Sequence, residues 1–207
     1  MRIPALRSSR LVGGEVSNVL GVDDSAARKL LRSGTLPEPT PASTLAPLRG
    51  WPMLTVSEGA LTVLRTDARK ASVDRHPQDV RRWIGFHVEH TDTELAESSL
   101  RWWRSNPETT VDNQLFAVVV AEFPVALYLI DKHFNSMIRE DEIRPRHQFE
   151  GRLLARITPG LSVRYTEGLP DWLVVPCRQV MTSRIQLVSG GPIGYLRRRV
   201  PAPAAGM

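Results

Sequence analysis

Four polar residues recur at helical spacing in one short basic stretch: Ser25, Arg28, Lys29 and Arg32. Steps of three and four residues place side chains on one face of a helix. An arginine guanidinium can donate two hydrogen bonds to a guanine edge, and a lysine ammonium can neutralise a phosphate. These residue types at this spacing predict a helix whose chemistry is contact with a nucleic acid.

Histidines and the cysteine are the other reactive side chains. His87 and His90 lie three residues apart with Glu89 between them, and these residue types can bind a metal ion. Zinc-binding pairs on a helix more often lie four residues apart, in the pattern His-Glu-x-x-His. The single cysteine, Cys177, lies far along the chain. We therefore expect no metal site, and we expect Cys177 to be an inert thiol rather than a nucleophile.

Two further segments contain residue types that are found in active sites, but neither has the other residues that catalysis or phosphate binding needs. The acidic run Glu140, Asp141 and Glu142 is typical of a solvated surface. The glycine pair Gly190 and Gly191 has neither the lysine nor the spacing of a phosphate-binding loop. No catalytic constellation results, so the sequence predicts a protein that is not an enzyme and uses no cofactor.

Two helices around a tight turn are expected within residues 7–34, and they would position the basic face. Apolar residues recur there at helical steps: Leu11, Val16, Val19, Leu20, Val22, Ala26, Ala27, Leu30 and Leu31. Gly21 interrupts this pattern and marks the turn, and Asp23 is placed to cap the second helix. Gly34 is expected to end that helix.

Residues 15–37 resemble the winged helix-turn-helix of MerR-type regulators and phage excisionases. The shared pattern is a helix ending in Leu-Gly-Val, a polar start to a basic second helix, and a closing Gly-x-Leu-Pro. These parts appear here as residues 20–22, 23–32 and 34–37.

The resemblance implies that the second helix enters the major groove of double-stranded DNA. Arg28, Lys29 and Arg32 would then carry the contacts, with Ser25 as a lesser one.

Residues 36–52 depart from that family. The family follows Leu-Pro with an arginine-rich hairpin, the wing, whereas this stretch holds five prolines and Arg49 as its one basic residue. Proline at this density predicts an extended loop without a helix. Arg49 is therefore the one DNA contact expected here. A short strand is expected over residues 53–56, and a helix over 58–71 that braces the recognition helix.

A helical connector is expected over residues 72–110. Pro77 stands where a helix can begin. Thr91 and Glu94 have the spacing of a capping box, and the helix after them should end before Asn106 and Pro107.

Short strands dense in Val, Leu and Tyr dominate the rest of the chain. They are expected over residues 115–121, 125–130, 152–158, 161–166, 172–175, 184–188 and 193–196. Pro124 predicts a bend or bulge between the first two. Together with Trp102-Trp103-Arg104 and residues 149–152, their order is similar to PUA-like small barrels of the ASCH or EVE type, which bind nucleic acid or a modified base. The alternative is a β-rich effector or dimerisation domain.

The distribution of charge favours the front of the chain for polyanion binding. Up to Gly85 there are 13 Lys and Arg against 8 Asp and Glu, and beyond it there are 14 of each kind. No apolar run approaches the roughly 20 residues that cross a bilayer. A lone cysteine fits a reducing cytosol. We therefore expect a cytoplasmic protein with no membrane partner.

The predicted fold class is α+β: an N-terminal winged helix-turn-helix, then a β-rich domain that is an antiparallel sheet or small barrel. The expected divisions are 1–71 for DNA binding, 72–110 for the connector, 111–199 for the β-rich domain and 200–207 for a disordered tail.

Three functions stay open. The first is sequence-specific binding of double-stranded DNA by a transcriptional regulator or excisionase-like protein, whose β-rich domain forms a homodimer or senses a ligand. The second is a nucleic-acid processing or defence component whose β-rich domain binds modified or single-stranded nucleic acid. The third is a protein-interaction adaptor.

Overall fold

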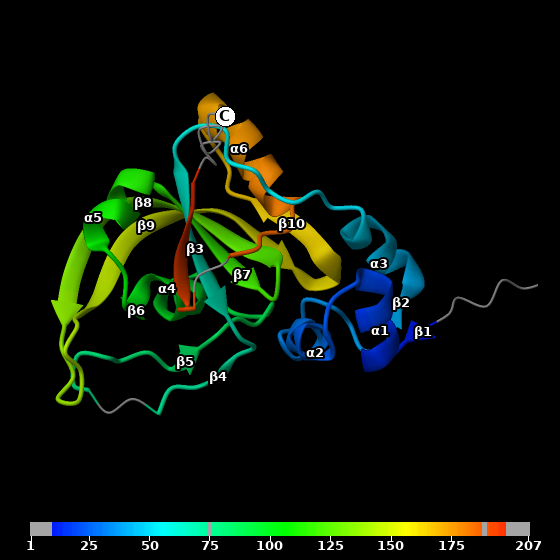
Figure 1. Cartoon of the computed structure of the whole chain (residues 1–207), viewed down its shortest axis with the longest axis horizontal. Helices are drawn as coiled ribbons and strands as arrows, with labels where there is room; N and C mark the ends of the chain where they lie inside the picture. The colour runs from blue at the N-terminus through cyan, green and yellow to red at the C-terminus, as the bar shows by residue number, and fades with distance from the viewer. Residues whose placement is uncertain (1–9, 74–75, 188–189, 198–207) are drawn as a thin grey trace, which may run out of the picture.

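A curled sheet is the largest feature of the structure, a computed structural model that describes residues 10–73, 76–187 and 190–197 (Figure 1). The strand order is β10-β9-β8-β7-β3-β11, and β6 pairs with β9. The strands are β3 (Ala60–Thr66), β6 (Arg101–Trp103), β7 (Leu115–Val120), β8 (Phe123–Met137), β9 (Arg146–Thr158), β10 (Ser162–Tyr165) and β11 (Ile193–Arg197). Six α-helices accompany the sheet in the described residues, so the fold is mixed α and β.

Strands β7 and β8 form the apolar centre of the sheet. Side chains on both faces of β7 and of the first half of β8 are buried, which explains their continuous apolar runs in the sequence. The ladder between the two strands shifts register after Val118, where Pro124 enters, and the predicted bulge is thereby confirmed. The strands expected over residues 152–158, 161–166 and 193–196 are confirmed as parts of β9, β10 and β11.

The front of the chain folds as the two helices that the sequence predicts, α1 (Gly13–Leu20) and α2 (Asp24–Arg32). Gly21 forms the turn between them with a φ of 67°. Asp23 caps α2, since its side chain accepts a hydrogen bond from the Ala26 amide at 2.8 Å.

Helix α3 (Ala42–Arg49) contradicts the expected helix-free loop over residues 36–52. Pro41 stands just before the helix, where a missing amide costs little, and Pro47 removes a single bond near its end. Leu45 and Leu48 are buried on its inner face, and this burial outweighs the lost bond.

The connection from α2 to α3 contains no hairpin of its own. Its strand β2 (Thr40–Pro41) has two residues and pairs with β1 (Arg10–Leu11) ahead of α1. Helix α3 then packs against α1. The helix expected after Met53 to brace α2 is absent, because residues 60–66 form β3 instead.

The helix predicted over residues 58–71 is wrong. This segment forms β3 and then β4 (Lys70–Ala71), and β3 runs parallel to β7 and antiparallel to β11. Its residues 61–64 are all buried, a run that suits a strand covered on both faces and does not suit a helix with one exposed face.

Two strands predicted near the end of the chain are also wrong. Residues 172–175 lie in helix α6 (Asp171–Met181), whose buried side chains recur at helical spacing: Leu173, Cys177, Val180 and Met181. Residues 184–187 form no strand, and residue 188 lies outside the described residues. Arg184 makes an isolated bridge to Met53, which is all that remains of the strand expected over residues 53–56.

The capping box expected at Thr91 is confirmed. The Glu94 amide donates to Thr91 Oγ1 at 3.1 Å, and α4 (Asp92–Leu100) follows and ends well before Asn106. Strand β6 and helix α5 (Pro107–Asn113) come next without having been predicted. No helix begins at Pro77, which lies in a turn of the connection between β4 and β5 (Trp83–Ile84). These two short strands pair antiparallel and form the β4–β5 hairpin.

Strand β3 ties the two halves of the chain together. It falls within residues 1–71, expected to be the DNA-binding domain, yet its neighbours β7 and β11 come from later segments. Residues 198–207, which include the expected tail, lie outside the described residues. No helix in the part of the chain that the structure describes is long and apolar enough to span a membrane.

Candidate nucleic-acid interface

Helix α2 presents the basic side chains that the sequence predicts. Ala27 and Leu30 are fully buried on its inner face, whereas Ser25, Arg28 and Arg32 are exposed. Lys29 lies between the two faces and is partly buried. The apolar spacing of the helix therefore decides which face is inward and leaves the cationic side chains outside.

The two carboxylates at the start of α2 serve the fold of the helix. The bond from the Ala26 amide holds the pKa of Asp23 below its ordinary value. The Ser17 hydroxyl donates to Asp24 at 2.6 Å and ties α2 to α1. Both carboxylates lie at the N-terminus, where the helix dipole stabilises negative charge.

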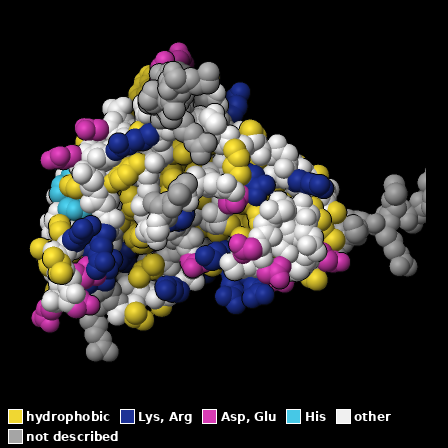
Figure 2. Space-filling model, in the orientation of Figure 1, with side chains coloured by type: hydrophobic (Ala, Val, Ile, Leu, Met, Phe, Trp, Pro, Cys, Tyr) yellow, Lys and Arg dark blue, Asp and Glu magenta, His cyan; other side chains and the backbone are white. Residues whose placement is uncertain are grey.

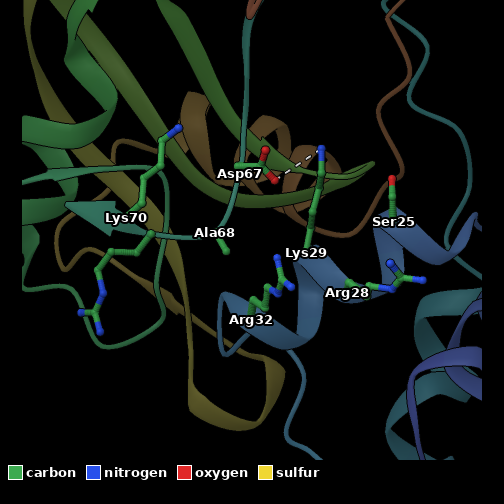
Figure 3. Close-up of a pocket in the computed structure, with 8 residues that line it drawn as sticks. Ser25, Arg28, Lys29, Arg32, Asp67, Ala68 and Lys70 are labelled. Carbon is green, nitrogen blue, oxygen red and sulfur yellow. Dashed lines mark ion pairs between the residues drawn. The ribbon is translucent and has the colours of Figure 1, made fainter. Parts of the chain in front are cut away.

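The outer face of α2 borders a hollow of about 590 Å³, which we call the basic groove (Figure 3). One wall consists of Ser25, Arg28, Lys29 and Arg32 from α2, and the other consists of Asp67, Ala68, Arg69 and Lys70 from the segment after β3. Five of these eight side chains are cationic and one is anionic. The groove therefore attracts polyanions.

One ion pair crosses the basic groove. Lys29 Nζ lies 3.4 Å from Asp67 Oδ1, and the two side chains point toward each other in Figure 3. Their side chains are 40% and 61% exposed, so the pair is worth at most about 1 kcal/mol and can be exchanged for other ions. Among the described residues, Arg28 and Arg32 form no ion pair and remain available to a ligand.

The far wall leads into the β4–β5 hairpin, and Lys70 is the one lining residue that lies in β4. Lys70 pairs with Ile84 in the ladder, and the guanidinium carbon of Arg69 lies 4.9 Å from the centroid of the Trp83 ring. Arg82 approaches the same ring at 4.9 Å. These distances are typical of cation–π contacts, which restrict the two arginine side chains.

The residues of the far wall were missed from the sequence. The sequence predicts a helix over residues 58–71 that supports the recognition helix, and it assigns Arg69 and Lys70 no role in binding. A signal was present, because this adjacent pair lies in the front segment that carries the whole excess of positive charge.

Basic side chains gather on the corresponding surface. In Figure 2, Lys and Arg side chains cluster at the lower edge, over the place that α2 occupies in Figure 1. Arg49 does not belong to this cluster. It is the last residue of α3, and it is absent from the lining of the basic groove.

The side chains considered for other chemistry remain apart from the groove or are buried. Burial raises the pKa of the Cys177 thiol to about 11, so the thiolate is scarce at neutral pH. Burial also lowers the pKa values of His87 and His90. In the described residues, no group of three or more His, Cys, Asp and Glu side chains is placed to hold a metal ion.

A serine and two histidines meet across β8 and β9, which sequence spacing did not reveal. Ser136 Oγ lies 2.9 Å from His147 Nδ1 and 3.0 Å from His133 Nε2. Nucleophilic catalysis also needs a group that orients the imidazole. Within the described part of the chain, neither ring is hydrogen-bonded to a carboxylate, so this cluster does not complete a catalytic triad.

Comparisons with protein-family models, with curated proteins and with solved structures give no match to this chain. The helix-turn-helix and PUA-like resemblances therefore stay predictions, and function has to be inferred from the groove itself.

Proposed function

We propose that the protein binds double-stranded DNA in a sequence-specific manner, with α2 as the helix that enters the major groove. The observation that carries this proposal is the outer face of α2, where Ser25, Arg28 and Arg32 are exposed on a helix that packs against α1 and is hydrogen-bonded to it. A recognition helix needs such a polar, basic face on a fixed support.

The side chains divide into two kinds of contact. Arg28 and Arg32 lie four residues apart without ion-pair partners among the described residues, so both can make paired hydrogen bonds to guanine edges. Lys29 lies deeper in the groove and suits a phosphate, and Ser25 can contact a base or the backbone. The protein acts as a regulator of the helix-turn-helix kind and performs no catalysis.

Charge supports the same proposal. Five cationic residues line the groove against one carboxylate. Each phosphate that they neutralise releases counterions, so DNA binding should weaken as salt rises.

Selection from a random duplex library tests the role of Arg28. Arg28→Ala should weaken binding to the selected sequence by roughly 5- to 150-fold, the value of one paired contact to a base. It should also relax the preference at one position. Arg178→Ala is the matched control, because Arg178 is exposed on α6 and does not line the groove.

If Arg28→Ala binds as the control does, α2 is not the recognition helix. If the full chain binds no duplex at all, the adaptor function becomes the better explanation.

A further inference from the structure

The basic groove has two walls that come from distant parts of the chain. One is the recognition helix of the proposed function, and the other is residues 67–70, which lead from β3 into β4 of the β4–β5 hairpin. The connection between α2 and α3 forms no hairpin, so the chain lacks a wing at the place where the resemblance implies one. A basic hairpin nevertheless lies beside α2, contributed by the region next to the sheet.

Backbone contacts pair residues 67–69, which directly follow β3, with Phe86 at the base of the hairpin. The Phe86 amide donates to the Asp67 carbonyl at 2.8 Å, and the Arg69 amide donates to the Phe86 carbonyl at 2.8 Å. Ala68 also forms a bridge with Phe86, which is fully buried. The far wall is therefore held in position before any ligand binds.

A further backbone contact fixes α2 to the same region. The Val88 amide donates to the Ser33 carbonyl at 2.9 Å, directly after the last turn of α2. The two walls of the groove are thus joined through residues 86–88, and the groove needs little rearrangement to close on a ligand.

The hairpin side chains suit phosphate rather than bases. Lys70 and Arg82 are exposed, and Arg69 is held against the Trp83 ring with its guanidinium restricted. When α2 lies in a major groove, the sugar–phosphate backbone that borders this groove runs beside the helix. The basic groove lies next to α2, and the Lys29–Asp67 ion pair that crosses it has to open when a backbone enters.

We propose that the β4–β5 hairpin is a second DNA-contacting element, which holds the phosphodiester backbone of one strand in the basic groove against α2. This inference rests on the proposed function of α2. It makes the hairpin a replacement for the missing wing, and it makes the DNA footprint larger than that of the helix-turn-helix alone.

The test measures binding of the full chain to the selected duplex and to a random duplex over a salt series. The variants are Lys70→Gln and the double variant Arg69→Ala/Lys70→Gln. Arg178→Gln removes one positive charge, as Lys70→Gln does, and is the control for that single variant. Each lost phosphate contact should reduce the slope of log affinity against log salt by about 0.9. Affinity for both duplexes should fall by the same factor, and the selected sequence should not change.

Two outcomes would overturn the inference, and they are distinguishable. In the first outcome, Arg28→Ala weakens DNA binding as proposed, but the hairpin variants show the same affinity and salt slope as Arg178→Gln. The hairpin then does not touch DNA, and the proposed function of α2 stands. If wild type binds no duplex, both proposals fail together. Lys70→Gln keeps the test valid if the double variant does not fold, because Lys70 is exposed and forms no ion pair among the described residues.

Discussion

The Lys29 side chain faces a carboxylate across the groove instead of open solvent. Its ion pair with Asp67 must be given up or rearranged when Lys29 contacts a phosphate. Asp67 is also the one anionic side chain in the lining, so it repels the ligand that the other five attract.

Asp67→Asn should therefore strengthen binding to any duplex. We expect an increase of roughly two- to fivefold at low salt, in the range of a surface ion pair, and a smaller increase at high salt. Fluorescence anisotropy with a labelled duplex measures it, and Asp171→Asn, exposed at the start of α6, is the control. Unchanged or weaker binding would show that no phosphate approaches Asp67.

His90 is a buried residue whose protonation should affect folding. Its ring nitrogens are buried without hydrogen-bond partners, and burial, aided by the charge of Arg69, lowers the pKa of His90 from 6.5 to about 4. Glu94 opposes this shift, whereas His87 and Arg156 add to it.

The folded protein should lose stability as the pH falls from 6.5 to about 4, because the unfolded chain takes up the His90 proton first. The loss is on the order of 3 kcal/mol. His90→Leu should make the free energy of unfolding less dependent on pH in this range. It should lower stability little at neutral pH, since the His90 ring makes no hydrogen bond that would be lost. Urea unfolding at several pH values measures it, and an equal pH dependence in both proteins would contradict the assignment.

At the level of elements, the position of the β4–β5 hairpin depends on Gly85. Its φ is 93°, and a Cβ atom there would lie 2.6 Å from the Ala68 carbonyl oxygen and 2.8 Å from that of Asp67. Any larger residue would push apart the contacts that hold the far wall of the groove.

Gly85→Ala should lower the free energy of unfolding by about 1–3 kcal/mol and weaken binding to random duplex DNA. Gly14→Ala is the control, because nothing lies within 4 Å of its Cβ position and α1 should become slightly more stable. A Gly85→Ala protein with wild-type stability and affinity would show that the hairpin position is unimportant.

Sequence reasoning succeeded for elements whose signals are local. The Asp23 and Thr91 caps, the Gly21 turn and the apolar runs of β7 and β8 depend on neighbouring residues, and the structure contains each of them. The structure departs from prediction where distant partners decide. Residues 60–66 form strand β3 because β7 and β11 lie on either side of it. Helix α3 forms despite its proline because Leu45 and Leu48 are buried against the rest of the protein.

The same limit applies to the candidate site. The four polar residues of α2 could be read from their spacing, since they belong to one helix. The far wall could not be read, because the meeting of Arg69 and Lys70 with α2 follows from the path of the chain after β3.

For the whole molecule, β3 makes residues 60–66 part of a sheet whose other strands come from later in the chain. A fragment of residues 72–207 loses an interior strand and leaves the edges of β7 and β11 unpaired. We expect it to lack a cooperative thermal transition and native near-ultraviolet circular dichroism, whereas residues 51–207 should retain both. Cooperative unfolding of 72–207 would show that the sheet forms without β3.

Much of the excess positive charge in the first part of the sequence lies on one surface of the folded protein. The excess of positive charge before Gly85 includes both walls of the basic groove, so two distant segments form one positive surface. DNA binding by this surface is the central claim.

The most direct test measures binding of the full chain to random-sequence duplex DNA across a salt series, followed by sequencing of the bound fraction. We predict affinity that falls steeply with salt, together with enrichment of one sequence. A weak affinity that does not respond to salt, with no sequence enriched, would contradict DNA recognition by α2 and the basic groove.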